Sequence, residues 1–172
     1  SDSGARAVRA ILAEPDFHAT ASAGTGRAET GVVDLAIIGA GVSGISAAIE
    51  AKKAGLAFRV FEAAEIFSTV GNFPKAKPIY TYPVGMTPAG SLQFRSEVHP
   101  KETLLADLER ERRQAGIEAT PATIDRIAHR GGEIVGGKPA RAQDNAAPHH
   151  LVRELHGATH GVFEAHHTVA DS

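Results

Sequence analysis

A glycine-rich turn between a short apolar run and a helical pattern constrains this chain more than any other feature. Gly39, Gly41 and Gly44 have the spacing G-x-G-x-x-G and directly follow the apolar run Leu35 to Ile38. A short continuous apolar run is typical of a parallel strand that is buried on both faces. In this pattern the first glycine allows a tight turn, the second lets a pyrophosphate approach the backbone, and the third lets the helix pack closely on the strand. The motif therefore predicts a dinucleotide site at the start of a helix.

The residues after the turn supply the structural context that the motif requires. Apolar residues recur at helical spacing over 42–51, and Gly55 stands where a helix should stop. A second strand is predicted over 58–62. Its last residue, Glu62, lies 18 residues after Gly44, close to the offset of about 20 expected for a carboxylate that binds the ribose hydroxyls. The alternative is an ordinary βαβ unit with accidental glycines. Against it, the strand, the turn, the helix, the second strand and the acidic residue all occur in the order and at the spacing that the motif requires.

Composition excludes several classes of protein. The net charge of −2 gives no reason to expect a nucleic-acid or anionic-membrane surface. The absence of cysteine excludes a disulfide framework, a cysteine-ligated metal and a redox-active C-x-x-C within this chain. No apolar run approaches the roughly 20 residues that span a bilayer, and the N-terminus does not resemble a secretory signal. We therefore expect a cytoplasmic protein that binds neither nucleic acid nor membranes.

Beyond the turn, the pattern continues as an α/β layer. A proline-rich connection over 63–98 is predicted to be either a packed surface loop or a loop that covers a ligand. A helix is predicted over 100–116, with the charged run Glu109 to Arg113 as its solvated face. A strand at 117–119 and a hairpin of 123–129 with 133–135 follow. This order predicts a doubly wound parallel sheet with an antiparallel appendage.

The two ends of the chain differ in character from this middle part. Residues 1–31 are interpreted as a leader and linker, with a short helix over 5–12, and are hypothesised to be the end of another domain. Residues 137–172 contain six of the nine histidines and keep neither a helical nor a strand period. We predict that this irregular tail is mobile and holds no metal, because no carboxylate or cysteine pattern defines a ligand set.

A resemblance to a known family now becomes visible. Residues 33–62 resemble the FAD-binding fingerprint of flavoproteins with two dinucleotide-binding domains. The segments Ser68 to Pro74 and Thr81 to Pro83 are similar, more particularly, to thioredoxin-reductase-like flavoproteins of the bacillithiol-disulfide-reductase type. The resemblance covers about residues 31–135. It implies that 32–136 form a partial FAD-binding domain with a Rossmann-like fold, an incomplete form of the FAD/NAD(P)-binding domain.

The resemblance also implies a site and an activity. The chain would be the FAD-binding half of an NAD(P)H-dependent oxidoreductase, which passes a hydride through the flavin to an acceptor that the sequence does not name. It has no second G-x-G-x-x-G for NAD(P)H, and no side chain is a convincing catalytic acid, base or nucleophile. The alternatives are a dinucleotide-binding module without catalysis and a truncated or frameshifted product without activity. The residues expected to bind the cofactor are Gly39, Ala40, Gly41, Val42, Ser43, Gly44, Glu62 and Ala63.

Overall fold

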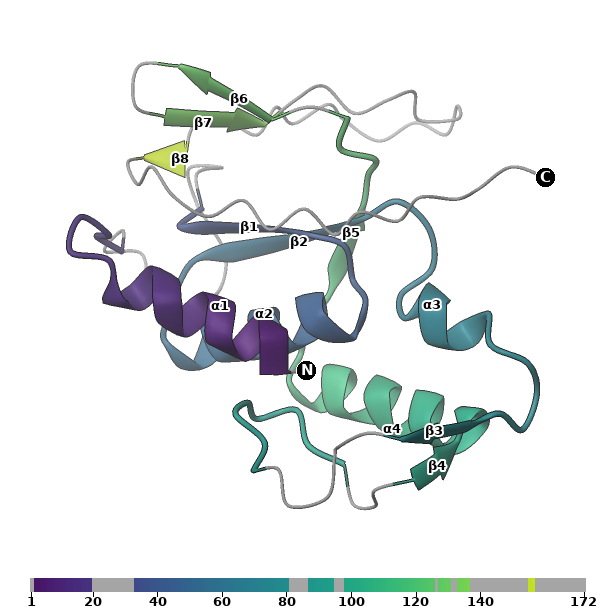
Figure 1. Ribbon diagram of the computed structural model, residues 1–172. Helices are drawn as coiled ribbons and strands as arrows, with labels where there is room; N and C mark the ends of the chain where they lie inside the picture. Colours follow the sequence, from purple (N-terminus) through teal and green to yellow (C-terminus); the bar gives the residue numbers. More distant parts are fainter. Residues whose placement is uncertain are drawn as a thin grey trace.

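A parallel sheet of three strands, in the order β1-β2-β5, lies at the centre of the fold (Figure 1). The strands are β1 (Leu35–Ile38), β2 (Phe58–Glu62) and β5 (Ala119–Pro121). The computed structural model describes residues 2–19, 33–80, 87–94, 98–125, 127–130, 133–136 and 155–156. The predictions for β1 and β2 are confirmed. The third strand begins two residues later than predicted, because Ile117 is instead bonded through its N–H and its carbonyl oxygen to Arg112.

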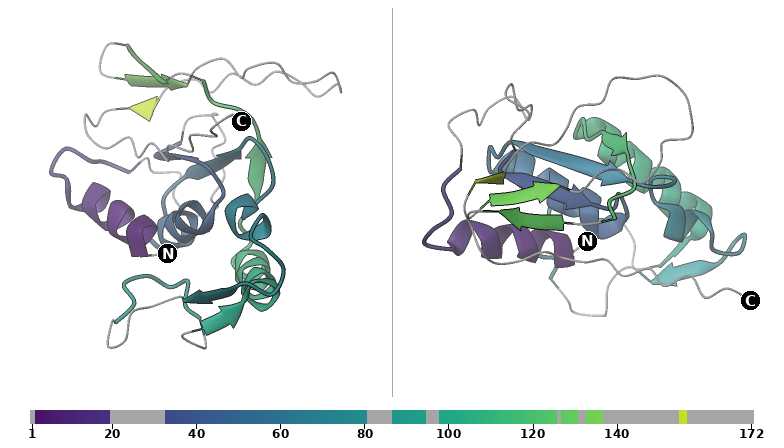
Figure 2. Two further views of the ribbon diagram at one scale, coloured as in Figure 1. Left: turned by 45° about the vertical axis from the view of Figure 1, so that its right-hand side comes forward. Right: turned by 90° about the horizontal axis from the view of Figure 1, so that it is seen from above.

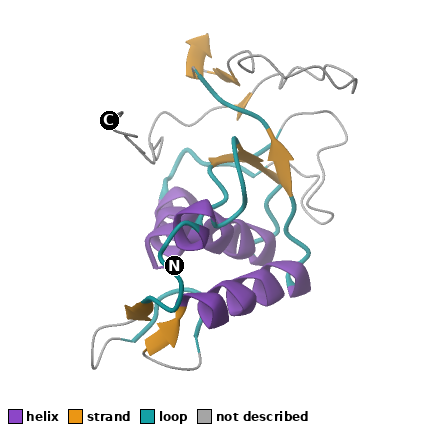
Figure 3. Ribbon diagram, turned by 90° about the vertical axis from the view of Figure 1, so that its right-hand side faces the viewer, coloured by secondary structure: helices purple, strands orange, loops and turns teal. Residues whose placement is uncertain are grey.

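Helices cover one side of this sheet, and an antiparallel unit lies on the other (Figures 1 and 3). Helix α2 (Val42–Lys53) connects β1 to β2 and packs on both strands. Helix α4 (Lys101–Gln114) precedes β5 and contacts α2. The core between them is apolar and contains Ile37, Ile45, Ala48, Leu56, Val60, Leu104, Leu108 and Ile117. None of the helices that the structure describes is both long and apolar enough to cross a membrane.

The antiparallel unit on the opposite side is the predicted appendage. Strands β6 (Ile127–Arg130) and β7 (Glu133–Gly136) pair antiparallel, as the hairpin prediction requires, although β6 begins four residues later than predicted. Figure 2 shows the pair from above. A third short strand, β8 (Leu155–His156), pairs with β7. Residues 155 and 156 are thus ordered within the tail predicted to be irregular. Its other residues lie outside the described part of the chain, so the prediction of a mobile, metal-free tail remains a prediction.

The long connection after β2 contains regular structure that the sequence did not reveal. It holds a short helix α3 (Ser68–Gly71) and two strands, β3 (Pro78–Tyr80) and β4 (Val98–Pro100), which pair antiparallel. Pro78 lies opposite Pro100 in this ribbon. Proline is tolerated in edge strands, and both strands of a two-stranded ribbon are edge strands, so these prolines do not prevent pairing. The prediction that 63–98 is a loop was wrong for the residues of α3, of β3 and of the start of β4, and residues 81–86 and 95–97 lie outside the described part.

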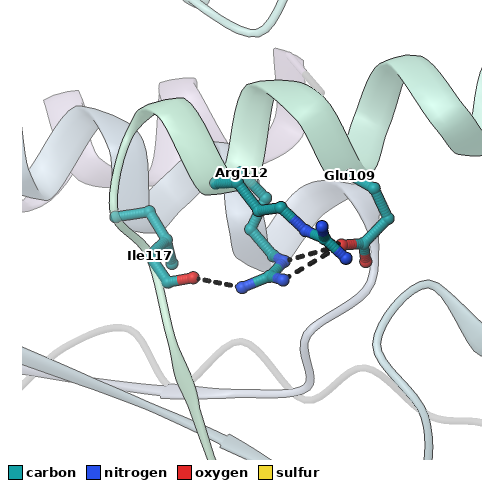
Figure 4. A network of polar contacts seen from close by, with 4 residues as sticks. Glu109, Arg112 and Ile117 are labelled. Carbon is teal, nitrogen blue, oxygen red and sulfur yellow. Dashed lines mark hydrogen bonds and ion pairs between the residues drawn. The ribbon is translucent and has the colours of Figure 1, made fainter.

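Helix α4 is confirmed, but residues 109–112 of its charged run are only partly exposed, and Arg112 is the least exposed of them. The Arg112 side chain is only 14% exposed. Its guanidinium donates hydrogen bonds to Glu109 Oε2 at 3.0 and 3.3 Å and to the Ile117 carbonyl oxygen at 2.6 Å (Figure 4). Arg112 therefore ties the last turn of α4 to the segment that leads into β5. Arg113, by contrast, is 75% exposed and fits the prediction of a solvated face.

The N-terminal residues assigned to a leader form helix α1 (Asp2–Ala13), which packs along α2 (Figure 2). Gly4, Ala5 and Val8 are buried in this contact. The helix is longer than the predicted 5–12 at its N-terminal end. The linker predicted over 19–31 lies, from residue 20 onward, outside the described residues.

Candidate dinucleotide site

The glycine turn leaves β1 at its carboxyl end and enters α2 within a few residues. Gly39 has φ +96°, a left-handed conformation that residues with a Cβ rarely adopt. Its N–H donates a hydrogen bond of 2.7 Å to the Phe61 carbonyl oxygen on β2. The tight turn predicted for the first glycine is therefore present, and it is attached directly to the neighbouring strand.

The third glycine has the close helix–strand contact that the motif predicts. A Cβ on Gly44 would lie 1.9 Å from the Gly39 carbonyl oxygen and 3.4 Å from Ile37 Cγ2. Real Cβ atoms essentially never come within 3.0 Å of another heavy atom in this way. Only a residue without a side chain lets α2 pack this closely on the end of β1.

The second glycine faces open space. Gly41 is the N-cap of α2, with φ −72° and ψ −175°, and a Cβ built on it meets no atom of the described residues within 4 Å. The first intrahelical bond of α2 runs from the Ile45 N–H to the Gly41 carbonyl oxygen at 3.0 Å. The N–H groups that precede it, at the helix end where the macrodipole is positive, have no partner within the helix. This open position at a helix N-terminus has the features of an anion-binding site.

Sheet register places Glu62 beside this turn. Ile38 pairs with Phe61, so Glu62 extends one residue past the end of β1. Its carboxylate accepts a hydrogen bond from the Ala40 N–H at 2.5 Å and another from the Ala64 N–H at 2.9 Å. A carboxylate has about four lone-pair sites, so two backbone bonds leave capacity for the hydroxyls of a ribose.

Both backbone groups of Ala40, the middle residue of the turn, are held. Its N–H donates to Glu62, and its carbonyl oxygen accepts a hydrogen bond of 3.1 Å from the Phe67 N–H. Ala40 is fully buried, and Phe67 is 1% exposed with φ +58°. A bulky residue with positive φ is uncommon and is maintained only where its surroundings require it. Phe67 therefore anchors the turn from α3, a role that no pattern in the sequence indicated.

The structure brings the predicted residues to one edge of the sheet. The residues from Gly39 to Gly44 form the glycine turn and the first turn of α2, while Glu62 ends β2 alongside them and the exposed Ala63 follows it. Within the part of the chain that the structure describes, no group of three or more His, Asp or Glu residues is arranged to hold a metal ion.

A parallel sheet with the G-x-G-x-x-G turn at the carboxyl end of its first strand, and an acid at the end of the second, defines the class of Rossmann-like dinucleotide-binding domains. The comparison with family models agrees, because residues 37–87 match the NAD(P)-binding Rossmann-like domain. The predicted Rossmann-like fold, a parallel sheet with helices and a small antiparallel unit, is thereby confirmed, although the described helices lie on one side of the sheet rather than on both. A search of curated protein sequences finds no match to the chain.

Among solved structures, two bacillithiol disulfide reductases share the fold. The enzyme from Staphylococcus aureus has a TM-score of 0.51 and 17% sequence identity, over 62% of this chain and 33% of that chain. The enzyme from Bacillus cereus has a TM-score of 0.51 and 18% identity, over 61% of this chain and 33% of that chain. The resemblance to flavoproteins of this type is confirmed at the level of the fold. The chain spans about a third of the length of each.

Proposed function

We propose that this chain is the FAD-binding part of an NAD(P)H-dependent flavoprotein oxidoreductase. The observation that carries the proposal is the open position beside Gly41 at the start of α2, with the Glu62 carboxylate at the adjoining strand end. An ADP half needs an anion site for its pyrophosphate and an acceptor for its ribose hydroxyls, and these two features supply both. The resemblance of residues 33–62 to the FAD-binding fingerprint, together with the similarity of fold to two bacillithiol disulfide reductases, supports FAD over NAD as the dinucleotide.

The residues present fit the ADP half of the cofactor. A Cβ at Gly41 would project into space that no other atom of the described chain fills, so a phosphate can reach the N–H groups of Val42 and Ser43. Glu62 would accept hydrogen bonds from the ribose, and the exposed Ala63 would lie beside it. Val42, Ser43 and the three glycines would thus orient the pyrophosphate through backbone groups. FAD, when bound, would supply the hydride chemistry, while the protein positions it and adjusts its electrostatics.

The proposal is tested by titrating the purified chain with ADP and with FAD in a calorimeter, beside the variant Gly41→Ala. Wild type should bind both ligands. Gly41→Ala should remain folded but bind at least about tenfold more weakly, because its methyl group occupies the closest approach of the pyrophosphate. Binding of FAD, unlike that of ADP, would also change the flavin absorption spectrum.

The matched control is Gly71→Ala. Gly71 ends α3, and among the described residues a Cβ there also meets no atom within 4 Å. The substitution therefore adds the same methyl group at a position away from the glycine turn. It should leave both affinities unchanged. If Gly41→Ala binds ADP as tightly as Gly71→Ala does, the pyrophosphate does not lie at this turn and the proposal is wrong.

A further inference from the structure

Helix α1 lies outside the residues that match the family model, yet its first turn is pressed against the first turn of α2. A Cβ on Gly4 would lie 2.0 Å from the Ser43 carbonyl oxygen and 2.7 Å from the Ala47 backbone nitrogen. Ser43 and Ala47 are four residues apart, the spacing of a helical hydrogen bond. Gly4 is buried, and only a glycine permits this approach. The backbone of α1 therefore rests directly on the turn that begins α2.

A separate segment fastens α1 in this position. Ala89 is bonded to α1 through both of its backbone groups: its N–H donates to Asp2 Oδ2 at 3.1 Å, and its carbonyl oxygen accepts a hydrogen bond from the Arg9 guanidinium. Two residues later, the Ser91 N–H donates to Glu50 Oε1 on α2 at 2.7 Å. Residues 89–91 thus bond to both helices and hold α1 against α2.

We infer that α1 braces the first turn of α2, and that Gly4 is a positioning residue for the dinucleotide site. The inference rests on the proposed function, in which the N–H groups of Val42 and Ser43 receive the pyrophosphate. Gly4 acts through Ser43: it touches the backbone whose N–H groups would be the donors. Small displacements of positioned groups have large effects on binding and rate. Replacing Gly4 should consequently lower the affinity for the dinucleotide, although Gly4 lies 35 residues before Gly39, the first glycine of the motif.

The test compares two substitutions on α1. Gly4→Ala places a methyl group against Ser43 and Ala47, whereas Val8→Ala removes buried apolar contact one turn further along the same helix, where Val8 is 1% exposed. Both weaken the docking of α1, but only the first displaces the start of α2. We expect Gly4→Ala to weaken ADP binding by about fivefold or more and Val8→Ala to stay within about twofold of wild type, as positioning predicts.

A second readout works without ligand. Amide hydrogen exchange reports local opening, so Gly4→Ala should speed exchange at Ile45 and Ala47 while the amides of the last turn of α2 keep their wild-type rates. Val8→Ala should not produce this local difference. Equal ADP affinity and equal exchange in the two variants would overturn the inference.

If Gly4→Ala does not fold, Asp2→Ala decides instead, because it releases the first turn of α1 from Ala89 without adding an atom: faster exchange at Ile45 and Ala47 supports the brace, and unchanged exchange refutes it. If wild type binds neither ADP nor FAD, the proposed function fails, and the exchange measurement still decides whether α1 braces α2.

Discussion

The Glu62 carboxylate accepts a hydrogen bond of 2.5 Å from the backbone N–H of Ala40, so the acid proposed to bind the ribose also holds the glycine turn. Ala40 is fully buried. Its N–H would lose its partner if the carboxylate were removed, and a buried unsatisfied donor costs about 1–3 kcal/mol. The same side chain thus couples the stability of the turn to the proposed binding of the dinucleotide.

This coupling makes the variants of Glu62 informative. Glu62→Ala should weaken FAD binding by about tenfold or more and lower thermal stability, because charge-assisted bonds to both ribose and backbone are lost. Glu62→Gln should do less harm to both, since one acceptor oxygen remains. Calorimetric titration and thermal unfolding of the three proteins measure the two effects. An alanine variant with wild-type affinity and stability would show that Glu62 is only a surface acid.

The surroundings of Glu62 also predict a preference among dinucleotides. A 2′-phosphate would be repelled by the carboxylate, and the next residues are Ala63 and Ala64 rather than an arginine that could receive it. Both alanines are exposed, and the Ala64 N–H is already bonded to Glu62. We expect FAD and NAD to bind more tightly than NADP. A competition among the three for the wild-type chain checks this, and equal binding of NADP would contradict it.

The third glycine of the motif should contribute to the stability of the fold. Gly44→Ala forces a Cβ to within 1.9 Å of the Gly39 carbonyl oxygen unless the helix or the strand moves. Such overpacking typically costs about 1–3 kcal/mol, occasionally more. Urea unfolding should therefore show a lower midpoint for Gly44→Ala than for Gly71→Ala, whose added Cβ meets no atom of the described residues within 4 Å. Equal midpoints would mean that the contact relaxes without cost.

Two neighbouring arginines provide a matched pair for testing the end of α4. Arg112→Ala removes hydrogen bonds to Glu109 and to the Ile117 carbonyl oxygen, whereas Arg113 is largely exposed. Hydrogen bonds to charged groups contribute about 1.5–3 kcal/mol, so Arg112→Ala should lower the free energy of unfolding by an amount of that order. Arg113→Ala should change it by less than about 0.5 kcal/mol. Equal losses in urea unfolding would refute the assigned role of Arg112.

Stability should fall in acid partly through Glu50. Burial raises the pKa of this carboxyl, but hydrogen bonds from Ser91 and the charges of Lys53 and Arg9 outweigh it, so its pKa lies below the ordinary value. The unfolded chain then binds the proton more tightly than the folded one. The contribution of Glu50 to the stability of the folded chain is present above its ordinary pKa of about 4.3. It is lost as the pH falls through the lowered pKa of the folded state.

The variant Glu50→Gln isolates this effect from that of the other carboxylates. Its free energy of unfolding should decline less steeply than that of wild type below about pH 5. Urea unfolding at a series of pH values measures both slopes. Identical slopes would show that Glu50 does not contribute to acid sensitivity. The hydrogen bonds from Ser91 would then not favour the charged form of Glu50 in the folded chain.

The parts of the fold set by local sequence were predictable. The apolar run of β1, the three glycines and the acid after β2 each express a local requirement, and the structure has the turn and the close packing that they predict. The ribbon of β3 and β4 was not predictable, because its strands are three residues each and are separated by 17 residues of sequence. Pairing over that distance leaves no local signal.

The candidate site was predictable to a similar extent. Its backbone donors and Glu62 follow from the motif, whereas their supports do not. Phe67 holds the turn by a hydrogen bond from its N–H to the Ala40 carbonyl oxygen, in a positive-φ conformation that its residue type disfavours. Gly4 belongs to a helix whose contact with α2 depends on tertiary packing alone. In both cases the role of the residue depends on which residue it contacts in the folded chain. A pattern of residue types along the sequence does not predict that contact.

Strand β4 runs into helix α4 without an intervening loop, because Pro100 both ends the strand and is the N-cap of the helix. The orientation of the helix is therefore set by the strand. An α-helix turns about 100° per residue, so one residue inserted between His99 and Lys101 would rotate α4 by that angle relative to the ribbon. Leu104 and Leu108 would then leave the core and charged residues would enter it. Deletions and insertions should accordingly be excluded at this junction over evolutionary time, while substitutions on the exposed face of the helix accumulate.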